Sequence, residues 1–238
     1  MNKIKSISIL FPLYNDKSTV EVMIIKSLRV LKKLNKKCEL IIVDDGCPQK
    51  SGQLAARLTK KISNVKIFFH KKNLGYGTAI RTGLKKCKSD WIFITDGDNE
   101  FDVNDLLKLV KAIKRNDLVI SYRHKKIYNT KRIIISWTYN VILRFLFRTK
   151  FRDVSSASRL VSKKIIKKIK LKSTSPFLGA EIAIKSLNAG YKVGQVGIYQ
   201  FPQTFRNESV SIKNIILTIK DMILLYCRNF SERKLSKN

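Results

Sequence analysis

The chain has 238 residues, of which 44% are hydrophobic and 9% aromatic, so it is long enough to fold around one sizeable core. Its 49 Lys and Arg residues outnumber 17 Asp and Glu residues, which gives a formal net charge of +32 spread along the whole sequence. This distribution excludes a single basic tail and predicts a basic surface suited to nucleic acid, an anionic membrane face or a phosphate-rich substrate. A genome of biased base composition would also produce such a lysine-rich chain.

The cysteines and the N-terminus bear on the cellular compartment. The four cysteines have neither the spacing of a zinc site nor that of a disulfide framework, so we expect reduced thiols. The first 16 residues contain only a short apolar run, without the longer apolar region and cleavage site of a signal peptide. A cytoplasmic location is therefore expected.

The first half of the sequence alternates between apolar, β-prone runs and segments with helical spacing. The predicted strands are residues 6–13, 38–46, 64–70, 90–96 and 117–123. The predicted helices are residues 18–35, 53–62, 77–87 and 103–114. Strands that are apolar on both faces and alternate with helices predict a mostly parallel sheet covered on both sides, an α/β fold of the doubly wound type.

Charged residues come directly after several of these strands. Asp44 and Asp45 end the second strand, Asp96 and Asp98 end the fourth, and Arg123 ends the fifth. Because ligands of such sheets bind beyond the carboxyl ends of the strands, we expect a binding site at this edge. Each aspartate alone could simply cap a helix or begin a turn, but this explains several together less well.

Two long segments of the second half combine apolar residues with flanking basic ones. Residues 131–148 are apolar around most of the helix, and residues 211–230 place one apolar face at Ile212, Ile215, Ile216, Ile219, Ile223 and Tyr226. Polar and charged residues interrupt both, so neither reaches the ~20 apolar residues of a membrane span. They could be core helices or helices lying in the plane of an anionic membrane. We expect a single domain, residues 1–238, with a membrane-facing C-terminal part.

The segment ITDGDNEFD, residues 94–102, gathers carboxylates after the fourth strand. Asp96 and Asp98, separated by Gly97, offer the hard oxygen ligands that Mg²⁺ or Mn²⁺ prefers. Carboxylates this close repel one another, and a divalent cation that bridges to a substrate diphosphate would offset that repulsion. The motif alone is a weak signal, so its neighbours along the chain matter.

Four motifs occur in order along the chain: ILFPLYND at 9–16, LIIVDDG at 40–46, NLGYGTAIRTGL at 73–84 and ITDGDNEFD at 94–102. Together they resemble the successive motifs of glycosyltransferase family 2, which has the Rossmann-like GT-A fold. The branch they look most similar to is that of the dolichyl- or polyprenyl-phosphate sugar transferases. The resemblance covers about the first 200 residues.

The resemblance implies a nucleotide-sugar-binding half at about residues 1–125. The donor-binding residues it implies are Pro12, Tyr14, Asp16, Asp44 or Asp45, Asn73, Gly75 and Gly77. The metal ligands it implies are Asp96, Asp98 and Glu100, for Mg²⁺ or Mn²⁺, and Arg206 is the implied diphosphate contact. Three departures stand out: Asp16 where the family usually has Glu, Cys47 where it commonly has Ser, and Glu100 where the branch often has Gln.

The resemblance also implies that about residues 126–238 form an acceptor and membrane-facing part. Arg123, Arg132 and Ser136 look like the branch's binders of the acceptor phosphate, and arginine suits this because its planar fork meets phosphate oxygens bidentately. Asp153 and Glu181 stand at acidic positions of the family. Each could be a catalytic base or a structural acid.

The implied function is metal-dependent, inverting transfer of a sugar from a nucleoside-diphosphate sugar to a polyprenyl phosphate, by a protein peripherally bound to the cytoplasmic membrane face. An alternative with the same fold has a sugar hydroxyl of a surface or lipid-linked glycan as acceptor, which would require a base. A third possibility, a basic nucleic-acid-binding protein, predicts salt-sensitive binding. No nucleic-acid motif is present, so we expect no nucleic-acid partner.

Overall fold

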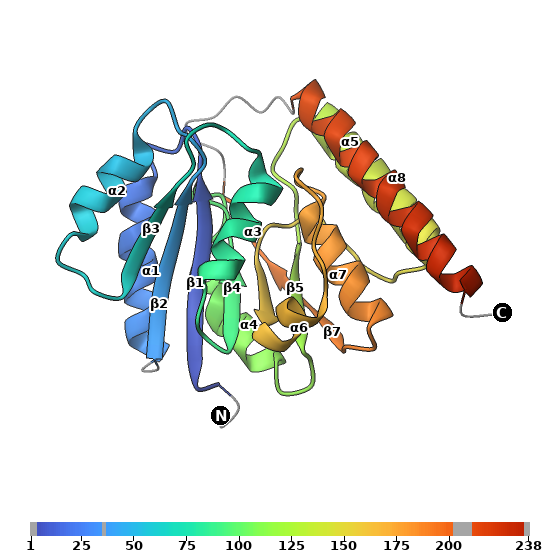
Figure 1. The fold of residues 1–238 in the computed structure, drawn as a ribbon, viewed down its shortest axis with the longest axis horizontal. Coiled ribbons are helices and arrows are strands. Elements are labelled where there is room, and N and C mark those ends of the chain that lie inside the picture. Colours follow the sequence, from blue (N-terminus) through green and yellow to red (C-terminus); the bar gives the residue numbers. More distant parts are fainter. Residues whose placement is uncertain (1–3, 35–36, 202–210, 236–238) are drawn as a thin grey trace.

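The computed structural model describes residues 4–34, 37–201 and 211–235. Through residue 123 its elements alternate as the sequence predicts (Figure 1): β1 (Ser6–Leu13), α1 (Val20–Leu34), β2 (Lys37–Asp44), α2 (Ser51–Thr59), β3 (Val65–Phe69), α3 (Tyr76–Lys86), β4 (Trp91–Ile94), α4 (Asp105–Ala112) and β5 (Leu118–Arg123). The later elements are α5 (Thr130–Phe147), β6 (Arg159–Ser162), α6 (Lys163–Lys168), α7 (Leu178–Asn188), β7 (Val193–Ile198) and α8 (Ile212–Leu235).

The described strands form one seven-stranded sheet in the order β3-β2-β1-β4-β6-β5-β7. Strand β6 is antiparallel to β4 and β5, and the remaining pairs are parallel. The predicted mostly parallel α/β fold is confirmed. The sequence did not predict β6 and β7, because β6 has only four residues and two glycines interrupt the apolar pattern of β7. Strands from before and after residue 125 therefore share one core.

Helices cover both faces of this sheet. One buried cluster joins α1, α2 and α4 to the side chains of alternate strand residues, such as Ile7, Ile9 and Phe11 of β1. The opposite cluster joins α3, α6 and α7, together with the inner residues of α5 and α8, to the other strand face, which includes Leu10. Strand side chains alternate between the two faces, so both clusters are apolar.

The carboxyl ends of β1, β2 and β4 meet at one edge of the sheet. The backbone N–H of Asp45 donates to the carbonyl of Leu13 at 3.0 Å. The turn after β4 packs directly on the end of β1: a Cβ added to Gly97 would lie 2.6 Å from the carbonyl oxygen of Pro12 and 2.9 Å from Leu13 Cδ2. Only glycine fits there, so the fold brings the acidic turn against the end of β1.

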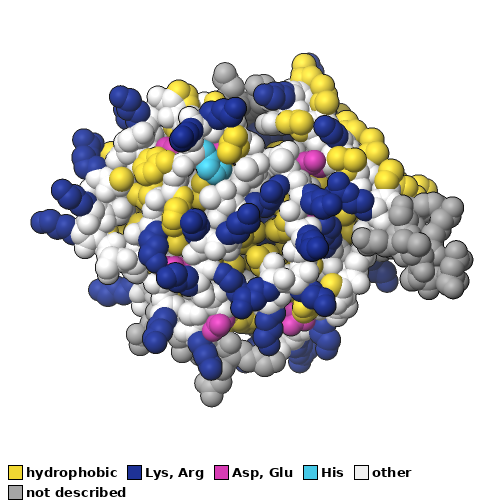
Figure 2. Space-filling view, in the orientation of Figure 1, with side chains coloured by type: hydrophobic (Ala, Val, Ile, Leu, Met, Phe, Trp, Pro, Cys, Tyr) yellow, Lys and Arg dark blue, Asp and Glu magenta, His cyan; other side chains and the backbone are white. Residues whose placement is uncertain are grey.

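Helices α5 and α8 turn apolar side chains outward. Near their C-terminal halves the rings of Phe147 and Tyr226 meet edge to face, with centroids 6.1 Å apart. We call their most exposed large apolar residues the apolar helix surface: Ile134, Trp137 and Phe145 of α5, with Ile212, Ile216, Ile219 and Ile223 of α8. Figure 2 shows hydrophobic side chains along the edge of the molecule where α8 lies. These faces are therefore not part of the core.

No helix within the described residues is both long enough and apolar enough to cross a bilayer.

Helix α8 is joined to the start of α3 through the segment 172–177. Asp221 of α8 accepts hydrogen bonds from the backbone N–H groups of Thr174 and Ser175, at 3.0 and 3.1 Å. The carbonyl of Thr174 accepts from the N–H of Gly77, at the start of α3, at 2.8 Å. A short chain of hydrogen bonds thus links α8 to the glycine-rich turn, residues 73–77.

Glu39 of β2 gathers hydrogen bonds near the amino-terminal end of β4. Its Oε1 accepts from Ser8 Oγ at 2.6 Å and from the backbone N–H groups of Lys88 and Ser89 at 2.6 and 3.2 Å. Burial alone would raise the pKa of Glu39, but the hydrogen bonds from Ser8 and this backbone outweigh burial and lower the pKa. The carboxylate therefore stabilises the fold in its charged form.

We expect Glu39→Gln to lower the free energy of unfolding by about 1–2 kcal/mol at neutral pH, because hydrogen bonds to a charged acceptor become bonds to a neutral one. A lowered folded-state pKa gives stability that is complete above the unfolded value of about 4.3 and is lost as pH falls through the folded value. The deficit of the variant should therefore shrink in acid. Urea unfolding at several pH values checks this, with the exposed Glu21→Gln as control. An equal deficit at all pH values would contradict it.

Candidate active site at the carboxyl edge of the sheet

The loop after β2 is held by two buried aspartates. The carboxylate of Asp44 accepts from the backbone N–H groups of Cys47 and Gly52, each at 2.7 Å, and so fixes its own loop and the start of α2. Asp45 accepts from the N–H groups of Leu74 and Gly75, each at 2.9 Å. Of the two expected donor-binding acids, Asp44 serves its own loop, whereas Asp45 ties β2 to the start of α3.

His70 completes the arrangement around Asp45. Its Nδ1 lies 2.7 Å from Asp45 Oδ1, and its Nε2 lies 3.0 Å from Thr82 Oγ1 of α3. The imidazole therefore braces the end of β3 against both neighbours. The sequence alone does not mark His70 as a site residue, because His70 comes close to Asp45 only when β2 and β3 pair.

The glycine-rich turn before α3 packs against protein. Gly75 has a φ of 92°, and its N–H also reaches Asn73 Oδ1 at 3.0 Å. A Cβ on Gly75 would lie 2.9 Å from the carbonyl oxygen of Thr174, and one on Gly77 would lie 2.7 Å from that of Ser173. Because these glycines lack a Cβ, the segment 172–177 can pack directly against the turn. One side of the turn that we expected to face the nucleotide is therefore covered by protein.

Asp16 lies beside the acidic turn. Its Oδ2 accepts from the N–H of Tyr14 at 2.9 Å, and the side chain is buried. Thr19 Oγ1 donates to the carbonyl of Gly97 at 2.7 Å. The expected donor residues Pro12, at the end of β1, and Tyr14 and Asp16, in the loop after it, thus lie against the Asp-Gly-Asp turn that follows β4.

Negative charge is concentrated at this turn, where Glu100 is buried and Asp96 and Asp98 are half-buried. Asp98 Oδ1 accepts from the backbone N–H of Glu100 at 3.1 Å. Burial, and next the charge of Asp98, raise the pKa of Glu100, while Tyr128 and Arg132 oppose this shift. Burial, followed by the charge of Asp96, raises the pKa of Tyr76 well above its ordinary value. In both cases burial of the group itself is the main cause, and the neighbouring carboxylates add to it.

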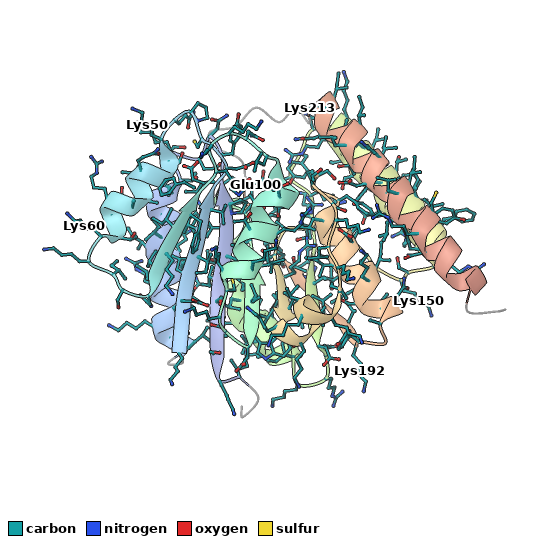
Figure 3. All side chains as sticks on the ribbon, viewed as in Figure 1. Lys50, Lys60, Glu100, Lys150, Lys192 and Lys213 are labelled. Atoms are coloured by element: carbon teal, nitrogen blue, oxygen red, sulfur yellow. The ribbon has the colours of Figure 1, made fainter. Side chains whose placement is uncertain are left out.

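Glu100 lies at the upper edge of the sheet in Figure 3. Its Oε2 accepts from the hydroxyl of Tyr128 at 2.8 Å and from Gln200 Nε2 at 3.1 Å. Its buried Oε1 accepts no hydrogen bond from the described residues and lies 3.9 Å from Arg132 Nη2. One oxygen of Glu100 is thus committed to the protein.

The acidic turn offers oxygen ligands to a metal ion. Within the described ranges, no three His, Cys, Asp or Glu side chains are grouped as ready metal ligands, so Asp96, Asp98 and Glu100 do not form a preformed three-ligand cage. Their chemistry still fits Mg²⁺ or Mn²⁺, because such ions are commonly held by one or two carboxylates and completed by substrate phosphates and water. The buried Oε1 of Glu100 and the crowded negative charge also fit a cation.

A basic pocket lies next to Glu100, centred on Arg123. Its Nε and Nη2 donate to the two carboxylate oxygens of Asp153 at 2.6 and 3.0 Å. Nη2 also donates to Ser155 Oγ at 2.6 Å, and Nη1 donates to the hydroxyl of Tyr128 at 3.1 Å. Burial alone would raise the pKa of Asp153, but the pair with Arg123 holds it well below its usual range. A carboxylate so stabilised is a weak base.

Two other expected acceptor residues lie at the edge of this pocket. The guanidinium of Arg132 stacks on the ring of Tyr128, 3.5 Å from its centroid. Ser136 Oγ lies 3.3 Å from Ser155 Oγ and accepts from Lys126 Nζ at 2.7 Å. The structure thus brings these residues together with Arg123. The expected diphosphate contact, Arg206, lies outside the described residues.

Glu181 is buried away from this pocket. It accepts from the backbone N–H groups of Lys172 and Ser173 and forms an ion pair of 2.7 Å with Lys185. Burial would raise the pKa of Glu181, but the hydrogen bonds from Lys185 and Ser173 lower it. For both Asp153 and Glu181, the contacts fit a structural acid better than a base.

Three residues of the site were not found by sequence reasoning. Tyr128 and Lys126 stand in a short polar loop before α5, where neither spacing nor apolar pattern marks them. Arg159 lies on β6, in register with Ile94 at the end of β4; it donates to the carbonyls of Ala157 and Ser156, and its buried Nη1 has no acceptor among the described residues. Of these three residues, only Arg159 could have been found from the sequence, and only by first predicting β6.

Comparisons with known proteins identify relatives of this chain. The family model described as glycosyl transferase family 2 matches residues 8–170. The chain is 27% identical over 122 residues to an undecaprenyl-phosphate 4-deoxy-4-formamido-L-arabinose transferase of Photorhabdus laumondii, covering 51% of this chain and 38% of that protein. It is 28% identical over 149 residues to the protein of the same name from Pectobacterium atrosepticum, covering 60% and 45%. The chain therefore matches less than half the length of these relatives.

Solved structures share the fold at low identity. Glucosyl-3-phosphoglycerate synthase of Mycobacterium tuberculosis, solved with Mn²⁺, uridine diphosphate and phosphoglyceric acid, superposes with a TM-score of 0.73 at 15% identity, covering 94% of this chain and 78% of that one. Mannosyl-3-phosphoglycerate synthase of Rubrobacter xylanophilus gives a TM-score of 0.74 at 14% identity, covering 96% and 75%. These neighbours establish the GT-A architecture. Because the family model matches more than half of its residues, the chain belongs to glycosyl transferase family 2, a family of sugar-transferring enzymes.

Proposed function

We propose that this protein transfers a sugar from a nucleoside-diphosphate sugar to a polyprenyl phosphate, such as an undecaprenyl or dolichyl phosphate, at the cytoplasmic face of a membrane. The observation that carries the proposal is the contact, through Tyr128, between the acidic turn and a basic pocket whose far side is the start of α5. The relatives named undecaprenyl-phosphate sugar transferases support the choice of acceptor.

On the donor side, the nucleotide would lie over the carboxyl ends of β1 and β2. The residues proposed to line it are Pro12, Tyr14, Asp16, Asp45, Asn73, Gly75 and Gly77, with Asp44 holding the loop beneath. The diphosphate would extend toward Asp96 and Asp98. Arg206 stays a proposed contact of the diphosphate.

Asp96 and Asp98 are the residues proposed to hold a divalent cation, with Glu100 close by. When bound, Mg²⁺ or Mn²⁺ would act as a Lewis acid that stabilises the charge developing on the departing diphosphate. Tyr128 and Gln200 fix the carboxylate of Glu100, so this acid cannot swing away from the turn. Fixed carboxylates need little rearrangement during the reaction, which favours the transition state.

The acceptor phosphate would bind at the basic pocket, near Arg132 and Ser136. A phosphate monoester is already ionised near neutral pH, so no base is needed to activate it. One of its oxygens would form a bond to the anomeric carbon of the sugar while the bond from that carbon to the diphosphate breaks, and the electron pair leaves with the diphosphate. A single displacement of this kind inverts the anomeric centre. The engagement of Asp153 and Glu181 in structural ion pairs supports a reaction without a protein base.

The apolar helix surface is proposed to lie against an anionic bilayer. Its most exposed side chains include Phe145 at 84% and Ile212 at 75%, and Lys131, Lys213 and Lys220 are exposed on the same two helices. Apolar side chains would enter the headgroup boundary, while lysines near an anionic surface contribute about 1 kcal/mol each. The chain's large positive charge makes an anionic leaflet the matching partner.

The function is tested by incubating the protein with a divalent cation, labelled sugar nucleotides and either a polyprenyl phosphate or the matching polyprenol. We expect labelled lipid only with the phosphate, and a loss of at least about 100-fold in Asp98→Asn, because stabilisation of the leaving group is worth several kcal/mol. Asp102→Asn, in the same acidic segment but bonded to Asn104 at the start of α4, is the matched control and should stay near wild type. Labelled polyprenol, or no labelled lipid from any donor, would reject the proposed acceptor.

Membrane binding is tested by sedimentation with vesicles that contain anionic phospholipid. The double variant Trp137→Ser/Phe145→Ser should bind at least about tenfold more weakly, because two large apolar side chains no longer leave water. Leu58→Ser/Leu187→Ser removes exposed apolar residues from α2 and α7 and should bind like wild type. Binding should weaken with added salt. Equal binding by both double variants would show that the membrane lies elsewhere.

A further inference from the structure

Lys126 lies inside the basic pocket, although the resemblance pointed to Arg123 and Arg132 as the cations for the acceptor phosphate. Its Nζ donates to Ser136 Oγ at 2.7 Å and lies 3.5 Å from Asp153 Oδ1. Its side chain is 19% exposed, compared with 4% for Arg123. The lysine is therefore partly buried but still open to the outside of the pocket.

Arg123 has little capacity left for a ligand. An arginine has five N–H groups, and four of these in Arg123 are hydrogen-bonded: two to Asp153, one to Ser155 and one to Tyr128. Its charge is matched by the carboxylate that it holds bidentately. A phosphate would have to break a buried bidentate ion pair to use Arg123 fully, which is costly because the carboxylate would be left without its partner.

The positive charge of Lys126 is not matched in the same way. Burial lowers the pKa of Lys126, and the charges of Arg123 and Arg144 lower it further, against the opposing effect of Asp153. The carboxylate of Asp153 is thus shared by two cationic side chains, Arg123 and Lys126. An anion in the pocket would restore the balance and favour the charged lysine.

The hydroxyl group of Ser136, beside Lys126, suits a phosphate. Ser136 Oγ accepts a hydrogen bond from Lys126 Nζ, so its own O–H group can turn toward a bound oxygen. Ser155 Oγ, 3.3 Å away, already donates to Asp153 Oδ1 at 2.6 Å and helps to hold the pocket in place. Ile133, one helical turn before Ser136, is 37% exposed and lies on the same side of α5. A phosphate at Ser136 would therefore have an apolar path beside it for a prenyl chain.

We propose that Lys126 supplies the ammonium group that binds the phosphate of the acceptor lipid, together with the hydroxyl of Ser136. Arg123 acts as a positioning residue, because it orients Asp153, Ser155 and Tyr128 around the pocket. This inference rests on the proposed function for the identity of the acceptor. The assignment of an anion site to Lys126 rests on its own contacts.

The test compares Lys126→Met with Lys125→Met, since Lys125 is the adjacent residue and is exposed to solvent. Lys126→Met should raise the KM for polyprenyl phosphate about 10- to 100-fold, as expected for loss of a hydrogen bond to a charged group, and leave the donor KM within about twofold. Lys125→Met should stay near wild type in both. Lys126→Arg should recover most of the acceptor affinity, because it restores the charge.

A binding measurement keeps the result independent of turnover. A water-soluble short-chain prenyl phosphate is titrated into each protein without donor, with the matching prenyl alcohol as the uncharged control. Lys126→Met should lose affinity for the phosphate by the same factor and should not change with the alcohol. Lys126→Gln keeps a polar group that can donate to Ser136, so it shows whether the loss comes from the missing charge or from a disturbed pocket. It should show the same loss of phosphate affinity. Circular dichroism checks that each variant is folded.

Unchanged phosphate binding in folded Lys126→Met, or an equal loss in Lys125→Met, overturns the assignment. The proposed function survives that result if these proteins still make lipid-linked sugar. If wild type makes none from any donor, the proposed function fails, and the binding titration still decides whether Lys126 holds a phosphate.

Discussion

The hydroxyl of Tyr128 is shared between the acidic turn and the basic pocket, and the arrangement of both depends on it. It donates to Glu100 at 2.8 Å and accepts from Arg123 at 3.1 Å, while Arg132 stacks on the ring. Burial, and next the charge of Glu100, raise the pKa of Tyr128, so the phenol keeps its proton and remains a donor. The neutral phenol thus joins Glu100 to Arg123, and the longer ion pair of 3.9 Å between Glu100 and Arg132 runs beside it.

The segment 172–177 connects the sheet to α8, one of the two helices proposed to meet lipid. Glu181 and Asp221 both accept from backbone N–H groups of the segment 172–177, and that segment packs on Gly75 and Gly77. Hydrogen bonds through this segment therefore join the glycine-rich turn to α7 and α8, and α5 meets α8 where Phe147 packs on Tyr226. These contacts would hold a soluble donor and the phosphate of a lipid at a fixed separation, which is what a reaction between two different phases requires.

The sequence was enough for the parts of the fold that depend on local pattern. Continuous apolar runs and helical spacing predicted β1 to β5 and the edge at which Asp45, Asp96 and Asp98 gather. It was not enough for β6, which is short and pairs with strands distant in sequence, or for Arg159, which depends on β6. Residue type also could not tell that Arg123 would be occupied by Asp153, because that pairing joins a strand end to a loop 30 residues later. The roles of the site residues in binding stay predictions.

The most direct test of the Tyr128 link is a double-mutant cycle between Tyr128→Phe and Glu100→Ala, measured as free energies of unfolding. If the hydroxyl and the carboxylate interact as described, removing the hydroxyl should cost at least about 1 kcal/mol less when Glu100 is already absent, because contacting residues are not additive. Tyr122 lies on β5, just before the loop that carries Tyr128. Tyr122→Phe should cost the same free energy of unfolding whether Glu100 is present or replaced by Ala. Additive costs for Tyr128 and Glu100 would show that the acidic turn and the basic pocket are independent, and would contradict the account.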